Sequence, residues 1–248
     1  MSSWFRVYRP VSWPRLRLVC FPHAGAGATA YRAWADLLPP DVELLSVCYP
    51  GRQDRFGEPF AASVDALAAG VTNALAPLTG TPFALFGHSM GALVAYEVAV
   101  RLEQAHEIVP RQLFVSGRWT PDREDTRNLH LADDDALIAE MTRLGNGELD
   151  IFTFTELRDL MLSVLRADYR VLFEHPRRAL TTVSAPIVAY SGDRDPGCAP
   201  DDVAGWARAT SARFELRVFP GDHFYLVPRA ADLVRDLTTR LSGAPFPR

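Results

Sequence analysis

The sequence predicts an α/β fold in which a mostly parallel central sheet carries helices on both faces and a helical insertion interrupts the alternation. Short apolar runs bounded by Gly, Pro or Asp recur along the chain, and helical patterns lie between them. Residues 119–182 break this rhythm, because they contain no convincing strand. The 248 residues are compatible with one large domain, since single α/β domains commonly reach about 250 residues.

Six apolar segments are expected to be strands: 16–21, 42–49, 82–87, 112–117, 186–192 and 214–219. The first, third, fourth and fifth of them are continuously apolar over at least four residues, which is typical of parallel strands covered on both faces. The segments expected to be helices around them are 31–38, 63–75, 90–105, 202–210 and 230–241. The alternation indicates an open, mostly parallel sheet.

The insertion carries helical signals at 133–144 and 155–174. Apolar residues recur at three- and four-residue steps in the second segment, which predicts an apolar stripe along one helix face: Leu157, Leu160, Met161, Val164, Leu165, Tyr169, Leu172 and Phe173. This stripe fits either docking on the core or a lid over a site for an apolar substrate. We therefore expect a core of residues 1–118 and 183–248 with a helical lid at 119–182. The acidic run 133–135 is typical of a helix cap rather than a metal site.

The composition excludes several kinds of chemistry. The chain has no lysine, so all 26 basic residues are arginine, against 30 acidic residues and a net charge of -4. It cannot form a Schiff base, a Ser-Lys dyad or a lysine-containing phosphate loop. The acidic balance argues against nucleic acid, and no run approaches the roughly 18 apolar residues of a membrane span. Three cysteines without a CxxC pair favour a reducing compartment, so we expect a cytoplasmic protein.

The strongest local signal is the G-x-S-x-G pattern at residues 87–91, where an expected strand ends and an expected helix begins. A serine at this junction occupies a sharp turn, and the glycines on either side remove side chains from crowded positions. The helix N-terminus supplies backbone donors where an oxyanion develops. The pattern predicts that Ser89 is a nucleophile.

A serine hydroxyl needs a base, and the base needs an orienting acid; the expected chain order is Ser, acid, His. The histidines after Ser89 are His106, His130, His175 and His223. The first lies in the connector after the nucleophile helix and the next two lie in the helical insertion. His223 alone follows the last expected strand, so it is the candidate base.

The acid should follow the preceding strand, where Asp193 and Asp195 are both available. We favour Asp195, because the proline after it biases its backbone toward an extended form that turns the carboxylate to a neighbouring loop. Asp193 is then a turn-forming residue. Asp222 is adjacent to His223 and would need an awkward geometry to reach its ring.

Small residues in FPHAGAGA (21–28) allow the backbone to approach a reacting carbonyl closely. We predict an oxyanion hole made by the N–H groups of Ala24 and Met90. The glycines of this loop do not complete a dinucleotide-binding G-x-G-x-x-G pattern. His23 is interpreted as a loop-packing residue, with a catalytic role as the alternative.

Five segments in order resemble the type II thioesterases, the stand-alone enzymes that accompany polyketide and nonribosomal peptide synthases: FPHAGAGA (21–28), YPGRQDR (49–55), GHSMGALVAYE (87–97), SGDRDP (191–196) and GDHFYL (221–226). The resemblance implies an α/β-hydrolase fold with a helical lid. It also implies hydrolysis of acyl groups from the phosphopantetheine thioester of carrier proteins, which clears misprimed or stalled synthases. By resemblance, the catalytic triad is Ser89, Asp195 and His223, and the oxyanion hole is Ala24 and Met90. Asp222 departs from the glycine often found before the catalytic histidine.

The expected protein is thus a serine thioester hydrolase, most simply a monomer, with acyl or peptidyl carrier protein domains as partners and no metal or redox cofactor. Enzymatic alternatives are a medium-chain fatty acyl carrier thioesterase, a general carboxylesterase, and acyl transfer to another acceptor by the same triad. A non-enzymatic alternative is a catalytically silent carrier-binding module.

Arginine must make any contact with an acidic carrier in this lysine-free chain. The candidates for such contacts are Arg52, Arg55, Arg177 and Arg178. For Arg52 and Arg55 the other interpretation is structural, namely that they brace their own loop through Asp54.

Overall fold

The computed structural model describes residues 2–123, 125–145 and 155–242. Within these ranges one sheet has the strand order β1-β3-β2-β4-β5-β6-β7. Its strands are β1 (Phe5–Arg6), β2 (Leu16–Phe21), β3 (Val42–Val47), β4 (Phe83–His88), β5 (Leu113–Ser116), β6 (Ile187–Gly192) and β7 (Phe214–Phe219). β1 runs antiparallel to β3, and all other neighbouring pairs are parallel. The predicted α/β-hydrolase architecture is confirmed.

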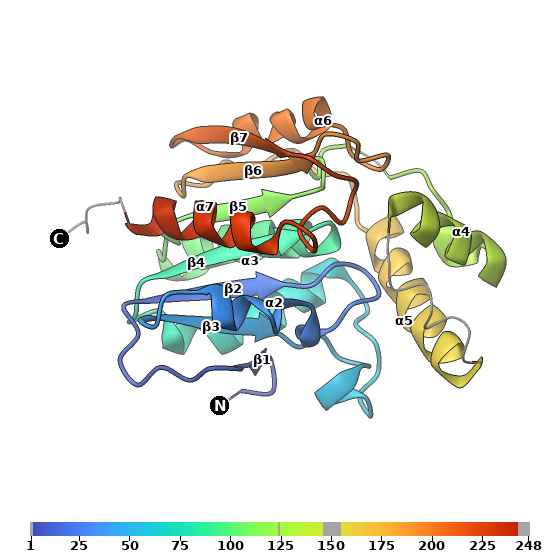
Figure 1. Cartoon of the computed structure of the whole chain (residues 1–248), viewed down its shortest axis with the longest axis horizontal. Helices are drawn as coiled ribbons and strands as arrows, with labels where there is room; N and C mark the ends of the chain where they lie inside the picture. Colours follow the sequence, from blue (N-terminus) through green and yellow to red (C-terminus); the bar gives the residue numbers. More distant parts are fainter. Residues whose placement is uncertain (1, 124, 146–154, 243–248) are drawn as a thin grey trace.

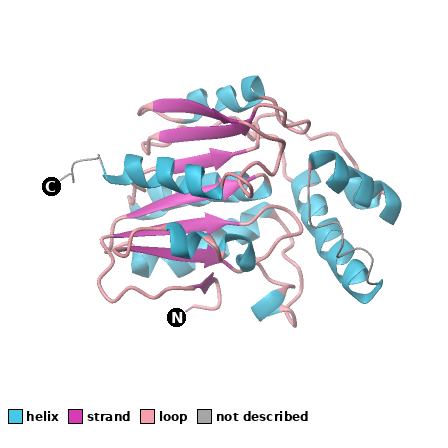
Figure 2. Cartoon of the chain, in the orientation of Figure 1, coloured by secondary structure: helices cyan, strands magenta, loops and turns pink. Residues whose placement is uncertain are grey.

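Helices cover both faces of this sheet (Figure 2). The helices that flank the sheet are α1 (Trp34–Leu37), α2 (Val64–Leu75), α3 (Met90–His106), α6 (Pro200–Ala204) and α7 (Ala230–Ser242), and two more, α4 (Asp134–Leu144) and α5 (Thr155–Phe173), lie beyond its edge. α1 packs with α7, and α2 packs with α3. Every residue of β3, β4, β5 and β6 is buried, as two covered faces require. These strands lie at the centre of a hydrophobic core to which β2, α2, α3 and α7 also contribute.

The expected strands all occur within one or two residues of their predicted limits, but β1 was missed. Two residues are too few to show an alternating pattern, and β1 is held only at the edge of the sheet, by β3. Two expected helices are shorter and tighter than predicted. Residues 31–38 form the end of a 3-10 turn and the four-residue α1, and residues 202–210 are divided between α6 and a 3-10 helix over Gly205–Ala209.

Between β5 and β6 the described residues hold α4 and α5 and no strand. Both helices lie beyond the ends to which the arrows of the parallel strands point (Figure 1). Asp133 begins α4 as its N-cap, since its Oδ1 accepts a hydrogen bond from Ala136 N at 2.8 Å. The expectation that the 133–135 run caps a helix is therefore confirmed.

The apolar stripe predicted on α5 is only partly buried. Leu165 and Leu172 are buried, whereas Leu157, Leu160 and Phe173 are exposed. The exposed leucines lie in the first two turns of the helix, so α5 docks on the rest of the molecule through its second half.

Candidate active site

Ser89 sits on a strained turn between β4 and α3. Its backbone has φ 53° and ψ -118°, a conformation with positive φ that non-glycine residues rarely adopt. Ser89 N donates to Ser116 O at 2.8 Å, which ties the turn to the end of β5. Ser89 is partly exposed, while its neighbours His88 and Met90 are fully buried. The turn therefore presents the hydroxyl-bearing residue to an open space above the sheet.

The two glycines of the G-x-S-x-G pattern allow this turn to pack against its surroundings. A Cβ on Gly87 would lie 2.0 Å from Gly91 O, and a Cβ on Gly91 would lie 2.0 Å from Phe21 O. Both contacts are with backbone atoms, which cannot move aside cheaply. The crowding expected from the sequence pattern is therefore present at both positions.

Asp195 and His223 lie together as expected. His223 Nδ1 is 2.7 Å from Asp195 Oδ2, and the Asp195 side chain is fully buried. The other carboxylate oxygen, Oδ1, accepts hydrogen bonds from Gly197 N at 2.7 Å and Cys198 N at 3.1 Å. These two backbone donors hold the carboxylate in place, so Oδ2 remains available to orient the imidazole.

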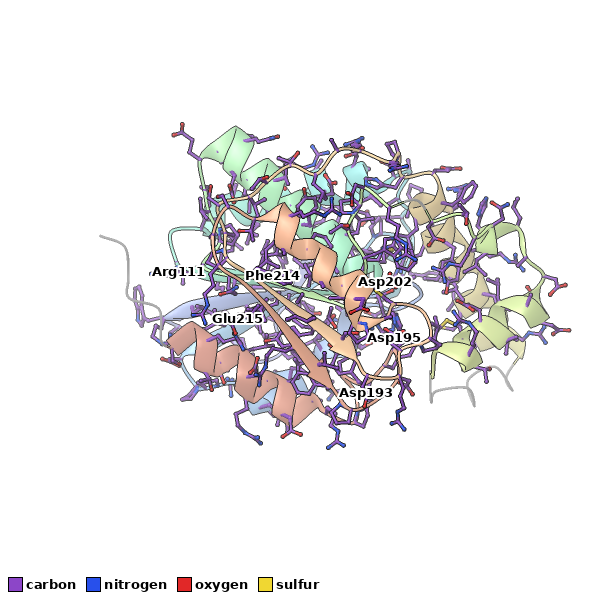
Figure 3. All side chains as sticks on the ribbon, turned by 90° about the horizontal axis from the view of Figure 1, so that it is seen from above. Arg111, Asp193, Asp195, Asp202, Phe214 and Glu215 are labelled. Atoms are coloured by element: carbon purple, nitrogen blue, oxygen red, sulfur yellow. The ribbon has the colours of Figure 1, made fainter. Side chains whose placement is uncertain are left out.

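The other two aspartates considered from the sequence have different contacts. Asp193 Oδ1 accepts from Gly221 N at 2.8 Å, and the Asp193 side chain is about half exposed, at 49%. Figure 3 shows Asp193 and Asp195 at one end of the sheet, with Arg111, Phe214 and Glu215 at the other. Asp222 Oδ1 accepts from Phe224 N at 2.9 Å within its own loop. Asp195 is thus the aspartate that contacts His223.

A pocket brings Ser89 and His223 together with Ala24. Its outer wall comes from α4 and α5, through Met141, Leu144, Tyr169 and Leu172. No hydrogen bond within the described ranges uses the N–H of Ala24, and Met90 is the first residue of α3, whose N–H has no partner inside the helix. Within the described part of the chain, neither predicted oxyanion donor has a hydrogen-bond partner, and both lie next to the nucleophile.

Buried histidines pack behind the reacting residues. The His88 and His223 rings lie 4.7 Å apart, centroid to centroid, and His88 Nδ1 is 2.9 Å from Ser116 Oγ. Burial and the nearby His223 lower the pKa of His23 to about 3, and burial also lowers the pKa of His88 well below its usual value. His23 and His88 are consequently neutral near pH 7. The pocket's remaining imidazole, His223, is the one that Asp195 orients.

The arginines of PGRQDR make structural contacts, but not the expected ones. Arg52 is buried and pairs with Asp168 of α5, while Arg55 pairs with Glu58 and stacks on Trp4 at 4.0 Å. Asp54 pairs instead with Arg6. Bracing through Asp54 was therefore wrong, and the burial of Arg52 and Arg55 removes them as carrier contacts.

Arg177 and Arg178, the other arginines considered for docking, are both exposed. Arg178 pairs with Asp65 at 2.7 Å.

Asp168 is the residue near the site that the sequence analysis missed. It lies on α5, three residues after Leu165 and four before Leu172, both of them buried stripe positions. An acidic residue on the apolar face of an amphipathic helix is costly to bury without a partner. That mismatch was the available signal of a buried ion pair.

The described ranges contain no group of three or more His, Cys, Asp or Glu side chains arranged to hold a metal ion. No helix within them is both long and apolar enough to cross a membrane.

The strained serine on a strand–turn–helix junction of a mostly parallel sheet defines an α/β-hydrolase. Residues 16–241 match the family model of the thioesterase domain. The chain belongs to this thioesterase family, whose members are enzymes.

Individual similar proteins indicate the type of thioesterase within this family. Thioesterase PikA5 of Streptomyces venezuelae is 41% identical, covering 99% of this chain and 89% of that protein. The RedJ thioesterase of the prodiginine pathway of Streptomyces coelicolor superposes with a TM-score of 0.86 at 37% identity, covering 92% of this chain and 91% of that one. The type II thioesterase BorB of the borrelidin cluster superposes with a TM-score of 0.87 at 36% identity, covering 96% and 97%. The resemblance to type II thioesterases is confirmed.

Proposed function

We propose that this protein hydrolyses acyl groups from the phosphopantetheine thioester of carrier proteins, by a Ser89-His223-Asp195 triad and an acyl-enzyme. The observation that carries the proposal is one pocket that joins a strained serine to an aspartate-held histidine. The type II thioesterase relatives support the thioester as substrate.

In the first half-reaction, His223 Nε2 takes the Ser89 proton as the oxygen attacks the thioester carbonyl. The carbon–sulfur bond breaks, the proton passes from His223 to the sulfur, and the carrier leaves as a free thiol. Asp195 keeps the Nδ1 proton of His223 in place, so that Nε2 is the basic nitrogen.

In the second half-reaction, water gives its proton to His223 and attacks the ester carbon. The Ser89–acyl bond breaks, Ser89 recovers the proton, and the carboxylic acid leaves. In both steps negative charge develops on the carbonyl oxygen, and the N–H groups of Ala24 and Met90 are the proposed donors to it. One such donor is worth about 3 kcal/mol of transition-state stabilisation.

The helices α4 and α5 are proposed as a lid. In this proposal residues 1–118 and 183–248 form the core, and residues 119–182 form the inserted lid. Their apolar side chains in the pocket wall, such as Met141 and Leu172, suit an acyl chain. Each buried methylene contributes about 0.8 kcal/mol of binding free energy. The proposed chemistry uses protein side chains, two backbone N–H groups and water, so it requires no cofactor. The three unpaired, buried cysteines support the proposed cytoplasmic location.

Carrier proteins loaded with acyl groups of increasing length test the proposal. Ser89→Ala should abolish release of the acyl group, while Ser184→Ala, at an exposed serine away from the pocket, should leave it unchanged. Undiminished release by Ser89→Ala would contradict the mechanism. Running acyl-coenzyme A and nitrophenyl esters in parallel separates a carrier-directed thioesterase from a general carboxylesterase. A wild-type protein that binds loaded carrier without turnover would instead be a silent carrier-binding module.

A further inference from the structure

The loop that carries Ala24 is held from outside the sheet by α5. Residues 23–26 form a tight turn, in which Ala26 N donates to His23 O at 3.1 Å and Gly25 has φ +82°. Gly25 N donates to Asp168 Oδ2 at 2.8 Å. A Cβ on Gly25 would lie 3.1 Å from Leu165 Cδ1. One face of α5 therefore rests directly on the residue that follows Ala24.

Arg52 completes this arrangement from a third segment. Its Nη1 and Nη2 donate to the two oxygens of Asp168, each at 2.6 Å, and Nη1 also donates to Ala26 O at 3.1 Å. Both side chains are almost fully buried, with 7% and 5% exposure. The bidentate geometry fixes the orientation of the carboxylate as well as its position.

We propose that Arg52 and Asp168 are positioning residues of the oxyanion hole. They fix the position and orientation of the Ala24 N–H by holding the turn 23–26 between α5 and the 50–55 loop. The inference rests on the proposed function, because it concerns the transition state of that reaction. Neither residue lines the pocket, so neither is a catalytic residue. They act through the backbone on either side of the donor, at Gly25 N and Ala26 O.

A buried ion pair is a costly way to stabilise a fold, since the desolvation of two charges offsets much of their attraction. Its fixed geometry is better suited to holding a backbone donor in register. The pair also makes the position of the Ala24 N–H depend on α5. If α5 were undocked, the turn 23–26 would lose its contact with Asp168. Acyl transfer and docking of the proposed lid are thereby coupled through one carboxylate.

The test measures kcat and KM for an acyl thioester of N-acetylcysteamine, together with the thermal midpoint. Asp168→Ala should lower kcat by about 100-fold, the loss expected when a catalytic group is misplaced by about 1 Å, with little change in KM. Asp168→Asn keeps an oxygen for Gly25 N and should lose less. Arg52→Lys keeps the positive charge but loses the bidentate contact with Asp168, and its kcat should lie between those of the wild type and Asp168→Ala.

Glu43→Gln is the matched control. Glu43 is also buried, accepts from Arg17 Nε at 2.9 Å and accepts from a backbone nitrogen, Val11 N, at 3.2 Å. It lies on β3, outside the pocket. Glu43→Gln should lower the thermal midpoint but leave kcat unchanged.

A boronic acid provides a second readout, because its tetrahedral adduct with Ser89 places an oxygen in the oxyanion hole. Its affinity should fall in parallel with kcat in the Asp168 variants. An unchanged kcat in Asp168→Ala, or an equal fall in Glu43→Gln, would overturn the inference. If Asp168→Ala does not fold, a wild-type kcat and boronic acid affinity in both Asp168→Asn and Arg52→Lys would do so. Failure of the proposed function is distinguishable, because the wild type itself would then release no acyl group.

Discussion

Replacing Asp195 by asparagine should prevent His223 from acting as the base while leaving the fold intact. Asp195 Oδ1 already accepts from Gly197 N and Cys198 N, so the asparagine oxygen will stay with these backbone donors. The amide nitrogen then replaces Oδ2, 2.7 Å from His223 Nδ1, and presents a donor where the wild type has an acceptor. His223 must shift its proton to Nε2, which can no longer accept one from Ser89.

A histidine held in the wrong tautomer costs about 10⁴-fold in kcat, equivalent to about 5.5 kcal/mol. Thiol release from an acyl thioester under saturating conditions measures this loss. Asp193→Asn is the control, because its half-exposed side chain keeps an oxygen for Gly221 N, and its kcat should stay within about twofold. A loss at Asp193 as large as at Asp195, or a loss below tenfold at Asp195, would refute the assignment of the acid.

Two further predictions concern the histidines. Gly117 has φ +59°, and Gly117→Ala would place a Cβ 2.6 Å from His88 Cε1 and 3.2 Å from His223 Cε1, so kcat and the thermal midpoint should both fall. Gly80→Ala is the control, because a Cβ there meets nothing within 4 Å, and it should change neither quantity. A wild-type kcat for Gly117→Ala would contradict this prediction. Because burial lowers the pKa of His23 from 6.5 to about 3, the unfolded chain binds more protons than the folded one between these values. The contribution of His23 to stability is therefore full above about pH 6.5 and is lost as the pH drops toward 3. In denaturant titrations His23→Gln should reduce the pH dependence of the unfolding free energy in this range by up to about 1.4 kcal/mol per pH unit; an unchanged pH dependence would refute the prediction.

The fold was predictable because its central strands are short, fully buried and therefore continuously apolar. That signal fails where the environment changes. β1 has two residues at the sheet edge, and the stripe of α5 includes exposed Leu157 and Leu160. Periodicity shows that a helix has an apolar face, but it does not show how much of that face another element covers.

The candidate site was predictable to the extent that its geometry is local. Ser89 and its two glycines lie within five residues, and the loops after β6 and β7 supply Asp195 and His223 at the same sheet edge. The Arg52–Asp168 pair joins residues 116 positions apart. No local pattern specifies that pairing, so for Arg52 the sequence suggests only a carrier contact or a bracing contact with its neighbour Asp54.

The absence of lysine and the burial of the cysteines also affect how readily activated acyl groups modify this protein without catalysis. Thioesters acylate exposed amines and thiolates without any enzyme. The sequence offers no lysine amine, and Cys20, Cys48 and Cys198 are all buried, with burial raising each thiol pKa, that of Cys48 to about 11. The protein is therefore a poor target for stray acylation by its proposed substrates. A mass increase of one acyl group after brief exposure to a thioester would report on Ser89 against a low background, which makes intact-protein mass spectrometry a direct record of the acyl-enzyme.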